Sequence, residues 1–584
     1  MYTILENARI VLALLKKHNI RHIVLSPGGS NIPIVQGVQQ DPFFKCYSVV
    51  DERSAMYFAI GLHLQTGEII ATSCTSAQAT RNYVPGLTEA YYKHVPILAI
   101  TMSKHPKYLG QEYMQCPIQT SLPVDAVKKS YSLPRIKDEH DRTQCVRTAN
   151  EAILELTHHG NGPVQLNIEE LDNETWVFDE NIESLLDVRC IKRYHYYDTI
   201  SKLDLEGKKI LILVGEHRPF SDVEKQKIER FCECHNAFVY SVITGNYHSK
   251  YALCPNALVH TMTQKRFETE FVPDILITIG GLTGDYDIYF KLFNAQPLSF
   301  EHWRVAEDGN VVDTYGKLTR IYEMREEDFF ESCDANANVH HSYYEQWNSA
   351  YREIKYDLDI PLSNLYAAIK LTKSLPKGSV LNMAILNSLR VWGLVGVDPS
   401  IECHSNIAAF GIDGCMSTLI GESVVTDKLS FLVTGDLAFY YDMNALGIRH
   451  IKNNLRILLC NNNGGMEFKF GNLVKKTDVG SYIAADNHFK DSEGWAKTCG
   501  FKYIQVKTKE EFDNHIEEFV GQSEQPILME IITTPENERQ AMDAFNKTNW
   551  NGTKDESFNK DVKDNLKMIL GESGFHIIKK IIGK

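Results

Sequence analysis

Asp436 and Asn462 each follow a run of apolar residues, and their side chains are of the kinds that hold a divalent metal ion. Asp436 comes after the predicted strand Leu429–Val433, and Asn462 comes after the predicted strand Leu455–Cys460. A helix-like segment separates them, so the stretch reads as a βαβ unit with polar groups at the carboxyl ends of two parallel strands, where open sheets bind ligands. Asp436 offers a carboxylate oxygen, Asn462 an amide oxygen and Gly464 an uncovered backbone carbonyl. Oxygens of these kinds suit Mg²⁺, which completes its octahedron with water and phosphate oxygens.

Glycines accompany both halves of this stretch. Gly435, Gly464 and Gly465 carry no side chain and let the backbone approach a diphosphate closely. The alternative is an ordinary βαβ turn with a solvated aspartate. Gly-Asp alone leaves that alternative open, but the run of asparagines and glycines at a second strand end favours a metal and diphosphate site.

The composition limits the classes of protein to which the chain can belong. The chain has 584 residues, too many for one core, which predicts two to four domains. Its net charge of −14 argues against a nucleic-acid partner. The 13 cysteines are scattered without a CxxC pair, and no secretory leader is evident, so we expect a reducing cytoplasm and free thiols. No apolar run is long enough for a transmembrane helix.

Alternating strands and helices predict an α/β fold with three doubly wound parallel-sheet domains, at 1–185, 186–345 and 346–540. Apolar runs place the strands of the first domain at Ile23–Leu25, Tyr47–Val50, Glu68–Cys74, Val95–Met102 and Pro163–Ile168, those of the second at Lys209–Val214, Ala237–Ser241 and Asp274–Ile279, and those of the third at Val380–Met383, Leu429–Val433, Leu455–Cys460 and Ile527–Ile532.

The two ends of the chain differ from the domains between them. Residues 1–19 have apolar side chains at helical spacing, which predicts an amphipathic packing helix rather than a signal peptide. The tail at 541–584 is first polar and then basic and apolar. It reads as a helix that docks on its own protein or as one that lies on a membrane surface.

Short motifs in a fixed order give the chain a family resemblance. It resembles the thiamine diphosphate (ThDP)-dependent 2-oxoacid decarboxylases and carboligases, and among them most closely the SEPHCHC synthases (MenD) of the menaquinone pathway. The matching blocks are Ser26-Pro27-Gly28, Asp51-Glu52-Arg53, Cys74-Thr75-Ser76 with Asn82, Leu282-Thr283-Gly284, Asn387-Ser388-Leu389, Gly411-Ile412-Asp413-Gly414, Asp436, Tyr441-Asp442 and Asn461 to Gly465. One block departs from the pattern, because Ala77 replaces the family's glycine.

The resemblance implies a pyrimidine-binding, a central and a diphosphate-binding domain, in that order, with ThDP and Mg²⁺ as cofactors. Glu52 would hydrogen-bond the aminopyrimidine and so promote loss of the C2 proton, with Gln115 near the pyrimidine amino group. Ile412 would wedge the cofactor into its bent form. The remaining cofactor-binding residues would be Pro27, Asn82, Gly435, Asp436, Leu437, Ala438, Asn462, Gly464 and Gly465, of which Asp436, Asn462 and Gly464 would hold the metal.

The family also joins pyrimidine and diphosphate domains of different subunits, and here Glu52 and Asp436 belong to different domains. The resemblance therefore implies an obligate homodimer, or a tetramer built as a dimer of dimers. It further implies a small 2-oxo acid and an acceptor as the molecules that the enzyme acts on.

The chain departs from this family where cationic side chains hold the substrate carboxylates. Gly29-Ser30 stands for the family's Ser-Arg, Ser103-Lys104 for Asp-Arg, Asp285-Tyr286 for Lys-Arg, and Trp392 and Ile407 for single arginines. A charge-assisted hydrogen bond is worth about 1.5–3 kcal/mol, so three losses would cost roughly 5–9 kcal/mol in binding. We therefore expect a MenD-like carboligase whose acceptor is not isochorismate. The candidate substrate residues are Gly29, Ser30, Lys104, Ser388, Arg390, Trp392 and Ile407.

Three other interpretations remain open. The chain could be a true SEPHCHC synthase with a rearranged anion clamp that uses Lys104, Arg390 and Arg304. It could be a flavin-carrying enzyme similar to acetolactate synthase, although the central domain has no distinct flavin motif. It could also bind ThDP or a partner without catalysis, and the intact Glu52 and Asp436 argue against that.

Overall fold

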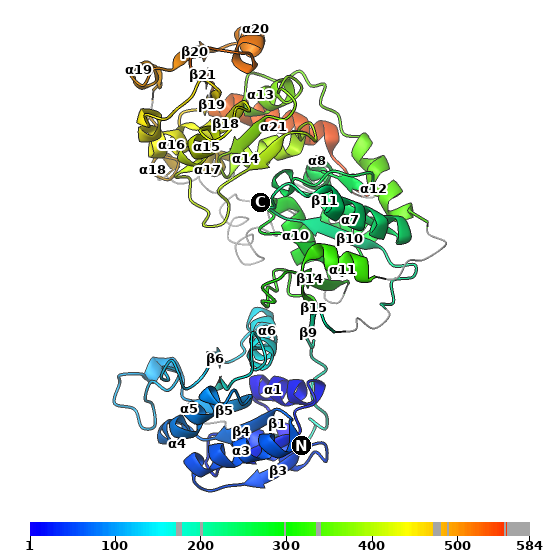
Figure 1. Ribbon diagram of the computed structural model, residues 1–584, viewed down its shortest axis with the longest axis vertical. Coiled ribbons are helices and arrows are strands. Elements are labelled where there is room, and N and C mark those ends of the chain that lie inside the picture. Colours follow the sequence, from blue (N-terminus) through cyan, green and yellow to red (C-terminus); the bar gives the residue numbers. More distant parts are fainter. Residues whose placement is uncertain are drawn as a thin grey trace, which may run out of the picture. The chain divides into compact units, whose positions relative to one another are not determined.

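The computed structural model describes residues 1–170, 178–198, 203–296, 299–333, 340–470, 480–487, 490–553 and 556. The chain divides into two compact units (Figure 1). The first comprises Met1–His195 and Glu307–Glu323, and the second comprises Tyr196–Ala306 and Met324–Lys584.

The first unit contains a six-stranded parallel sheet in the order β3-β2-β4-β5-β7-β6. Its strands are β2 His22–Leu25, β3 Lys45–Ser48, β4 Ile70–Cys74, β5 Ile97–Ser103, β6 Ser130–Leu133 and β7 Val164–Glu169. The chain leaves β2 for one edge and later returns on its other side as β4. The topological switch point, where doubly wound sheets bind ligands, therefore lies between the carboxyl ends of β2 and β4.

Helices cover this sheet, and short strand pairs complete the unit. The helices are α1 Glu6–Lys17, α2 Ile32–Gln39, α3 Glu52–Thr66, α4 Gln78–Asn82, α5 Val84–Tyr92, α6 Glu139–Glu155 and the 3₁₀ turn η1 Pro106–Tyr108. The pairs are β1 Tyr2–Thr3 with β8 Phe178–Asp179, and β9 Lys192–His195 with β15 Leu318–Glu323. α1 buries eight of its residues, which confirms the amphipathic N-terminal helix.

The second unit begins with a parallel sheet in which β12 Ala252–Leu253, β11 Ala237–Ser241, β10 Ile210–Val214, β13 Ile275–Ile279 and β14 Glu301–Val305 lie side by side in this order. The helical segments along this part of the chain are α7 Asp222–Cys234, η2 Ile243–Gly245, α8 Asn256–Thr261, α9 Gln264–Arg266, η3 Phe267–Phe271, α10 Tyr286–Asn294, α11 Glu326–Ser332 and α12 Ser342–Arg352. Its switch point lies between β10 and β13.

The last sheet repeats the topology of the first. Its order is β17-β16-β18-β19-β21-β20, and all neighbouring strands are parallel. The strands are β16 Val380–Met383, β17 Glu402–His404, β18 Ser430–Gly435, β19 Leu455–Asn461, β20 Lys502–Val506 and β21 Ile527–Ile532. Numbered along the chain, β16 to β21 occupy the places that β2 to β7 occupy in the first sheet. The switch point therefore lies between β16 and β18.

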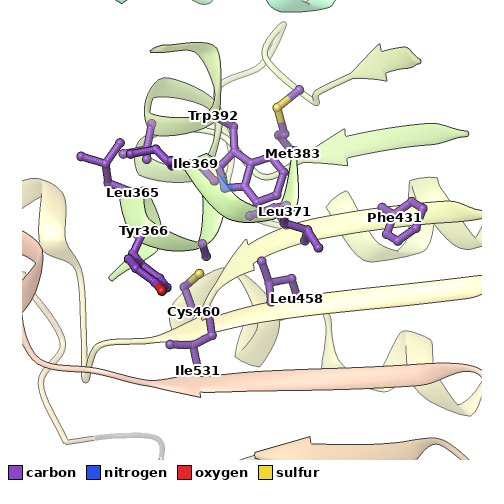
Figure 2. Close-up of a cluster of buried hydrophobic side chains, with 14 of the residues drawn as sticks. Leu365, Tyr366, Ile369, Leu371, Met383, Trp392, Phe431, Leu458, Cys460 and Ile531 are labelled. Atoms are coloured by element: carbon purple, nitrogen blue, oxygen red, sulfur yellow. The ribbon is translucent and has the colours of Figure 1, made fainter. Parts of the chain in front are cut away.

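The helices of this last part are α13 Asn364–Leu371, α14 Asn387–Val395, α15 Cys415–Ser423, α16 Asp436–Asp442, η4 Met443–Gly447, α17 Met466–Phe470, α18 Gly480–Ile483, α19 Glu493–Thr498, α20 Lys509–Val520 and α21 Pro535–Asn549. One hydrophobic core packs α13 and α14 onto the strands, and Figure 2 shows Trp392 of α14 beside Met383, Leu371 and Cys460. The predicted α/β class with three parallel sheets is confirmed.

Helix α21 corrects the predicted start of the tail. It runs past residue 541, and its Ala541 and Phe545 are fully buried in the core of the last sheet. Residues 541–549 therefore belong to the domain before them. Most of the remaining tail, including the basic and apolar segment, lies outside the described residues. Among the residues that the structure describes, no helix is long and apolar enough to cross a membrane.

Candidate functional site

Asp436 and the Asn462–Gly464 turn meet at the carboxyl ends of β18 and β19. Asp436 is the first residue of α16 and is almost fully buried. Its Oδ2 accepts a hydrogen bond from the Gly464 N–H at 2.8 Å, and its Oδ1 accepts one from the Leu437 N–H at 2.8 Å. The two strand ends are thus joined by a hydrogen bond. Gly435 directly precedes Asp436, and Ala438 is two residues after it in α16.

The turn after β19 requires a glycine at position 464. Gly464 has a φ of +127°, and a Cβ at this position would lie 2.6 Å from both the Ala484 carbonyl oxygen and Asp486 Oδ1. Only glycine fits such a place. The N–H of Gly465 donates to the same Ala484 oxygen at 2.6 Å. The backbone is therefore drawn tightly around the end of β19.

The three consecutive asparagines, Asn461 to Asn463, have different structural roles. Asn461 Nδ2 donates to Glu530 Oε1 at 2.7 Å and to the Lys490 carbonyl at 2.9 Å, so Asn461 ties the strand end to its neighbour. Asn463 takes the left-handed conformation, with a φ of +65°. Asn462 is buried, and its Oδ1 has no hydrogen-bond partner. A buried carbonyl oxygen without a partner costs stability, and a cation is one way to satisfy it.

Asp436 and Glu538 are buried carboxylates with raised pKa values. Burial raises the pKa of Asp436, although the N–H groups of Gly464, Leu437 and Asn463 and the Lys469 ammonium oppose the rise. Burial also raises the pKa of Glu538, in the first turn of α21, to about 7, and the Asp436 charge adds to the rise. An orphaned amide oxygen beside two such carboxylates fits a divalent cation held by hard oxygen ligands.

In the first unit, Glu52 and Asn82 are brought together. Glu52 begins α3, and the preceding Asp51 caps this helix by accepting a hydrogen bond from the Arg53 N–H at 2.9 Å. Asn82 Nδ2 donates to Glu52 Oε2 at 3.0 Å. A carboxylate at the start of a helix, oriented by an amide, has the fixed geometry that proton transfer requires.

The loops after β2 and β4 meet at the switch point of this sheet. Ser30 N donates to Thr75 Oγ1 at 3.3 Å, and the Ser30 and Ser76 hydroxyl oxygens lie 3.3 Å apart. A Cβ on Gly28 would lie 2.2 Å from Thr75 Cβ, so this glycine is required by close approach. Pro27 is exposed and Gly29 is half-buried, both in the loop after β2. Gln115 is exposed, with a φ of +56°, and is not joined to Glu52 by any hydrogen bond that the structure records.

Ala77 replaces the family's glycine at a position that demands one. It has φ +66° and ψ −117°, a conformation that costs a side-chain-bearing residue on the order of 1–3 kcal/mol. Its N–H donates to Gln119 Oε1 at 2.8 Å, which holds the strained backbone in place.

We therefore expect Ala77→Gly to stabilise the protein by about 1 kcal/mol, because the strain is relieved while glycine's extra freedom in the unfolded chain offsets part of the gain. Urea-induced unfolding followed by circular dichroism measures the change. Gly61→Ala is a matched control within α3, where the added methyl meets nothing within 4 Å. An unfolding midpoint for Ala77→Gly equal to or below that of the natural chain would contradict the strain.

Both cations among the candidate substrate residues are already paired. Lys104 forms an ion pair with the buried Glu170. Arg390 Nη1 lies 2.6 Å from both Oε1 and Oε2 of Glu467, and its guanidinium stacks on Tyr286 with its carbon 4.4 Å from the ring centre.

The apolar candidates pack inward. Trp392 is fully buried, and its Nε1 donates to Asn364 Oδ1 at 3.0 Å, so it lies in the core. Ser388 and Ile407 are also buried, and Ile407 lies against Gly284, where a Cβ would be 3.3 Å from its Cδ1. Ile412 is half-buried between two hydrophobic clusters of the last sheet.

Sequence reasoning missed three carboxylates, those of Glu170, Glu467 and Glu538. Each meets its partner through the fold, from a position far away in the sequence. Single glutamates at the start of a helix or the end of a strand are common, so no local pattern distinguishes them.

The switch point of the central sheet is closed by its own backbone. Glu216 N donates to the Leu282 carbonyl at 2.8 Å, and Gly281 N donates to the Glu216 carbonyl at 2.8 Å. A Cβ on Gly215 would lie 2.0 Å from the Gly281 oxygen. A dinucleotide would need this crevice open, so the geometry gives no support to the flavin alternative.

Comparisons with known proteins agree with this geometry. Residues 6–122 match the family described as "Thiamine pyrophosphate enzyme, N-terminal TPP binding domain". The chain is 35% identical over 550 residues to the 2-succinyl-5-enolpyruvyl-6-hydroxy-3-cyclohexene-1-carboxylate synthase of Phocaeicola vulgatus, covering 92% of this chain and 97% of that protein. It is 35% identical over 553 residues to the protein of the same name from Bacteroides thetaiotaomicron, covering 91% and 97%. It is 28% identical over 550 residues to the one from Flavobacterium johnsoniae, covering 91% and 97%.

Proposed function

Because this chain belongs to the thiamine diphosphate-dependent 2-succinyl-5-enolpyruvyl-6-hydroxy-3-cyclohexene-1-carboxylate synthase family, we propose that it decarboxylates a 2-oxo acid and transfers the resulting carbanion equivalent to an acceptor other than isochorismate. Bound ThDP would supply the electron sink for the decarboxylation. The observations that carry the proposal lie at the carboxyl ends of β18 and β19, where Asp436 is buried and the buried amide oxygen of Asn462 has no hydrogen-bond partner.

The residues of this cleft would hold the cofactor through Mg²⁺. Asp436, the Asn462 amide oxygen and the Gly464 carbonyl would be the protein ligands, and diphosphate oxygens and water would complete the octahedron. Gly435, Leu437, Ala438 and Gly465 would line the diphosphate.

Glu52, held by Asn82, would hydrogen-bond the pyrimidine, with Pro27 and Gln115 beside it. Ile412 would support the cofactor's bend. Each of these groups binds or orients the cofactor or moves a proton. None of them takes over the cofactor's role as electron sink.

The pairing of the cations supports an acceptor with fewer negative charges. Glu170 neutralises Lys104 and Glu467 neutralises Arg390, so releasing either one for a substrate carboxylate would cost its present ion pair. This disfavours a rearranged anion clamp. Tyr286 is in edge contact with the half-exposed Phe410, at 5.8 Å between ring centres, and it stacks on Phe290. We propose that the acceptor is more apolar or sugar-like and that these aromatic rings contact it.

Turnover assays test the proposal. The purified protein is incubated with ThDP, Mg²⁺ and each of a panel of 2-oxo acids that includes 2-oxoglutarate, together with isochorismate or an uncharged ring acceptor. Carbon dioxide release and coupled products are measured. We expect decarboxylation that needs both cofactors, and carboligation to at least one uncharged acceptor. A kcat/KM for isochorismate typical of menaquinone-pathway enzymes would refute the altered acceptor. No ThDP-dependent decarboxylation of any 2-oxo acid would refute the reaction itself.

We also propose that the protein acts in the cytoplasm as a homodimer or a tetramer. The assembly is proposed because Glu52 and Asp436 belong to different units of the chain and the family joins the corresponding domains of different subunits. Light scattering after size-exclusion chromatography checks the assembly, and a monomer with full activity would overturn this part.

A further inference from the structure

Two histidines and a glutamate lie close together in the first unit, and none of them belongs to the proposed cofactor or substrate residues. One ring nitrogen each of His158 and His159 and one carboxylate oxygen of Glu323 lie within 4.8 Å of one another. The histidines follow α6, and Glu323 is the last residue of β15. Among the residues that the structure describes, no other group of three His, Cys, Asp or Glu side chains is close enough to share an ion. Imidazole and carboxylate groups are ligands of Zn²⁺ and related transition metals.

The distances around Glu323 are those of metal ligands rather than of a hydrogen-bonded network. Glu323 Oε1 lies 3.4 Å from His159 Nε2, and Oε2 lies 3.4 Å from His195 Nδ1. The structure records no hydrogen bond between His159 and Glu323, and Oε2 is buried without a hydrogen-bond partner. Two ligand atoms bound at about 2.0–2.1 Å to one tetrahedral ion lie about 3.3–3.4 Å apart. The spacing of His159 and Glu323 therefore matches that of two ligands of one ion.

The surroundings hold these side chains in place. His158 Nδ1 lies 3.2 Å from Glu155 Oε2, a carboxylate partner of the kind that orients metal-binding histidines. The His158 ring packs on that of His159, with 4.0 Å between the ring centres. The Glu323 carboxylate lies against Gly309, where a Cβ would be 2.3 Å from Oε2. Because His158 is buried and His159 is exposed, the group is rigid on one side and open to an ion from solvent on the other.

Two contacts oppose an ion at this place and limit its affinity. His158 Nε2 lies 2.9 Å from the Asp308 carbonyl oxygen, and an ion bound through this nitrogen would replace that contact. Arg193 Nε lies 3.6 Å from Glu323 Oε2, and its positive charge repels a cation. The N–H groups of Arg193 are nevertheless directed to two backbone carbonyls, at 2.9 and 3.0 Å. We therefore expect binding of a metal that favours imidazole, and little binding of Mg²⁺.

We propose that His158, His159 and Glu323 form a binding site for a transition-metal ion such as Zn²⁺, with water in the remaining position. The first unit ends at Glu323, where the chain passes into the second unit. The ion would fasten this end of β15 to the end of α6 and so stabilise the first unit. The site does not depend on the proposed function, because it uses none of the residues assigned to ThDP or Mg²⁺.

Calorimetric titration of Zn²⁺ into the full chain tests the site. ThDP and excess Mg²⁺ are added first, so that the proposed diphosphate site is filled. We expect His159→Asn to weaken Zn²⁺ binding by at least about 10–100-fold, which is the effect of losing even a group that only orients a ligand. Asparagine suits the left-handed backbone at this residue, where φ is +49°. His94→Asn is the matched control, because it removes another exposed histidine that follows a helix, with a φ of +55°, and it should change nothing.

Each outcome decides for or against the site. No saturable binding of Zn²⁺ by the natural chain overturns it, and so does binding by His159→Asn within twofold of the natural chain. An equal loss in His159→Asn and His94→Asn would show unspecific binding by exposed histidines and would overturn it as well. Glu323→Gln removes the carboxylate ligand and should lose the binding too, so it decides if His159→Asn does not fold. The comparison holds whether or not the chain binds ThDP.

Discussion

Changing Glu52 to glutamine is expected to lower turnover by on the order of 10²–10⁴-fold, the usual contribution of a positioned acid–base group. The side chain begins α3 and receives a hydrogen bond from Asn82 Nδ2. Glutamine keeps the size of the side chain, and its oxygen can still accept from Asn82. It cannot share a proton with the pyrimidine in the same way. The chemistry should therefore be lost while the place for the cofactor remains.

Two measurements separate these effects. Exchange of the ThDP C2 proton for deuterium, followed by nuclear magnetic resonance after rapid quenching, should slow by a similar factor. The affinity for ThDP, measured by calorimetry, should change by less than about tenfold. Glu89→Gln, which removes a carboxylate from an ion pair with Lys93 on α5, is the matched control. Proton exchange at the natural rate in Glu52→Gln would remove Glu52 from its role.

The central strands of each sheet could be predicted from the sequence because both of their faces are buried. Strands at Ala237–Ser241, Val380–Met383 and Ile527–Ile532 are predicted with the bounds that the structure has. Such strands read as continuous apolar runs. Edge strands such as β17 and β20 do not stand out in the sequence, because they are short or carry polar residues that face solvent. For the same reason, the sequence pattern places the edge strand β3 two residues too late.

The site was predictable where its geometry is local to a strand end. Asp436 and the turn at Gly464 could be paired because neighbouring parallel strands bring their carboxyl ends together. Their spacing does not show the different partners of the three asparagines, because Asn461, for example, bonds Glu530, a residue far along the chain. Glu170 and Glu467, which neutralise Lys104 and Arg390, also lie far from their partners in the sequence. Sequence patterns identify the backbone frame of a site better than its long-range partners.

Replacing Asp436 with asparagine is expected to abolish Mg²⁺-dependent binding of ThDP. The substitution removes the charge of the one carboxylate proposed to touch the metal. A unit charge near a cation is worth about 4 kcal/mol at the effective dielectric constant of a protein surface, so the loss is on the order of 10³-fold in affinity. The asparagine NH₂ group would also face the N–H of either Leu437 or Gly464, both of which now donate to Asp436.

The rise in thermal unfolding temperature on adding ThDP with Mg²⁺ measures this effect, because a ligand stabilises only a protein that binds it. The natural chain should gain several degrees and Asp436→Asn none. Asp442→Asn, at the far end of α16, is the control, since Asp442 accepts from Ser417 N and Oγ at 2.7 Å each, away from the cleft. An equal gain for Asp436→Asn and the natural chain would exclude Asp436 as a metal ligand.

The rise in unfolding temperature caused by ThDP and Mg²⁺ should depend on pH. Burial raises the pKa of Asp436, and a metal binds only the ionised form, so protons compete with Mg²⁺ at this carboxylate. As the pH falls, the stabilisation by ThDP and Mg²⁺ should therefore decline at a higher pH than for an aspartate of ordinary pKa. Because the metal in turn favours the ionised form, raising the Mg²⁺ concentration should move the decline to lower pH. A gain that is independent of Mg²⁺ concentration throughout the decline would show that another group is titrating.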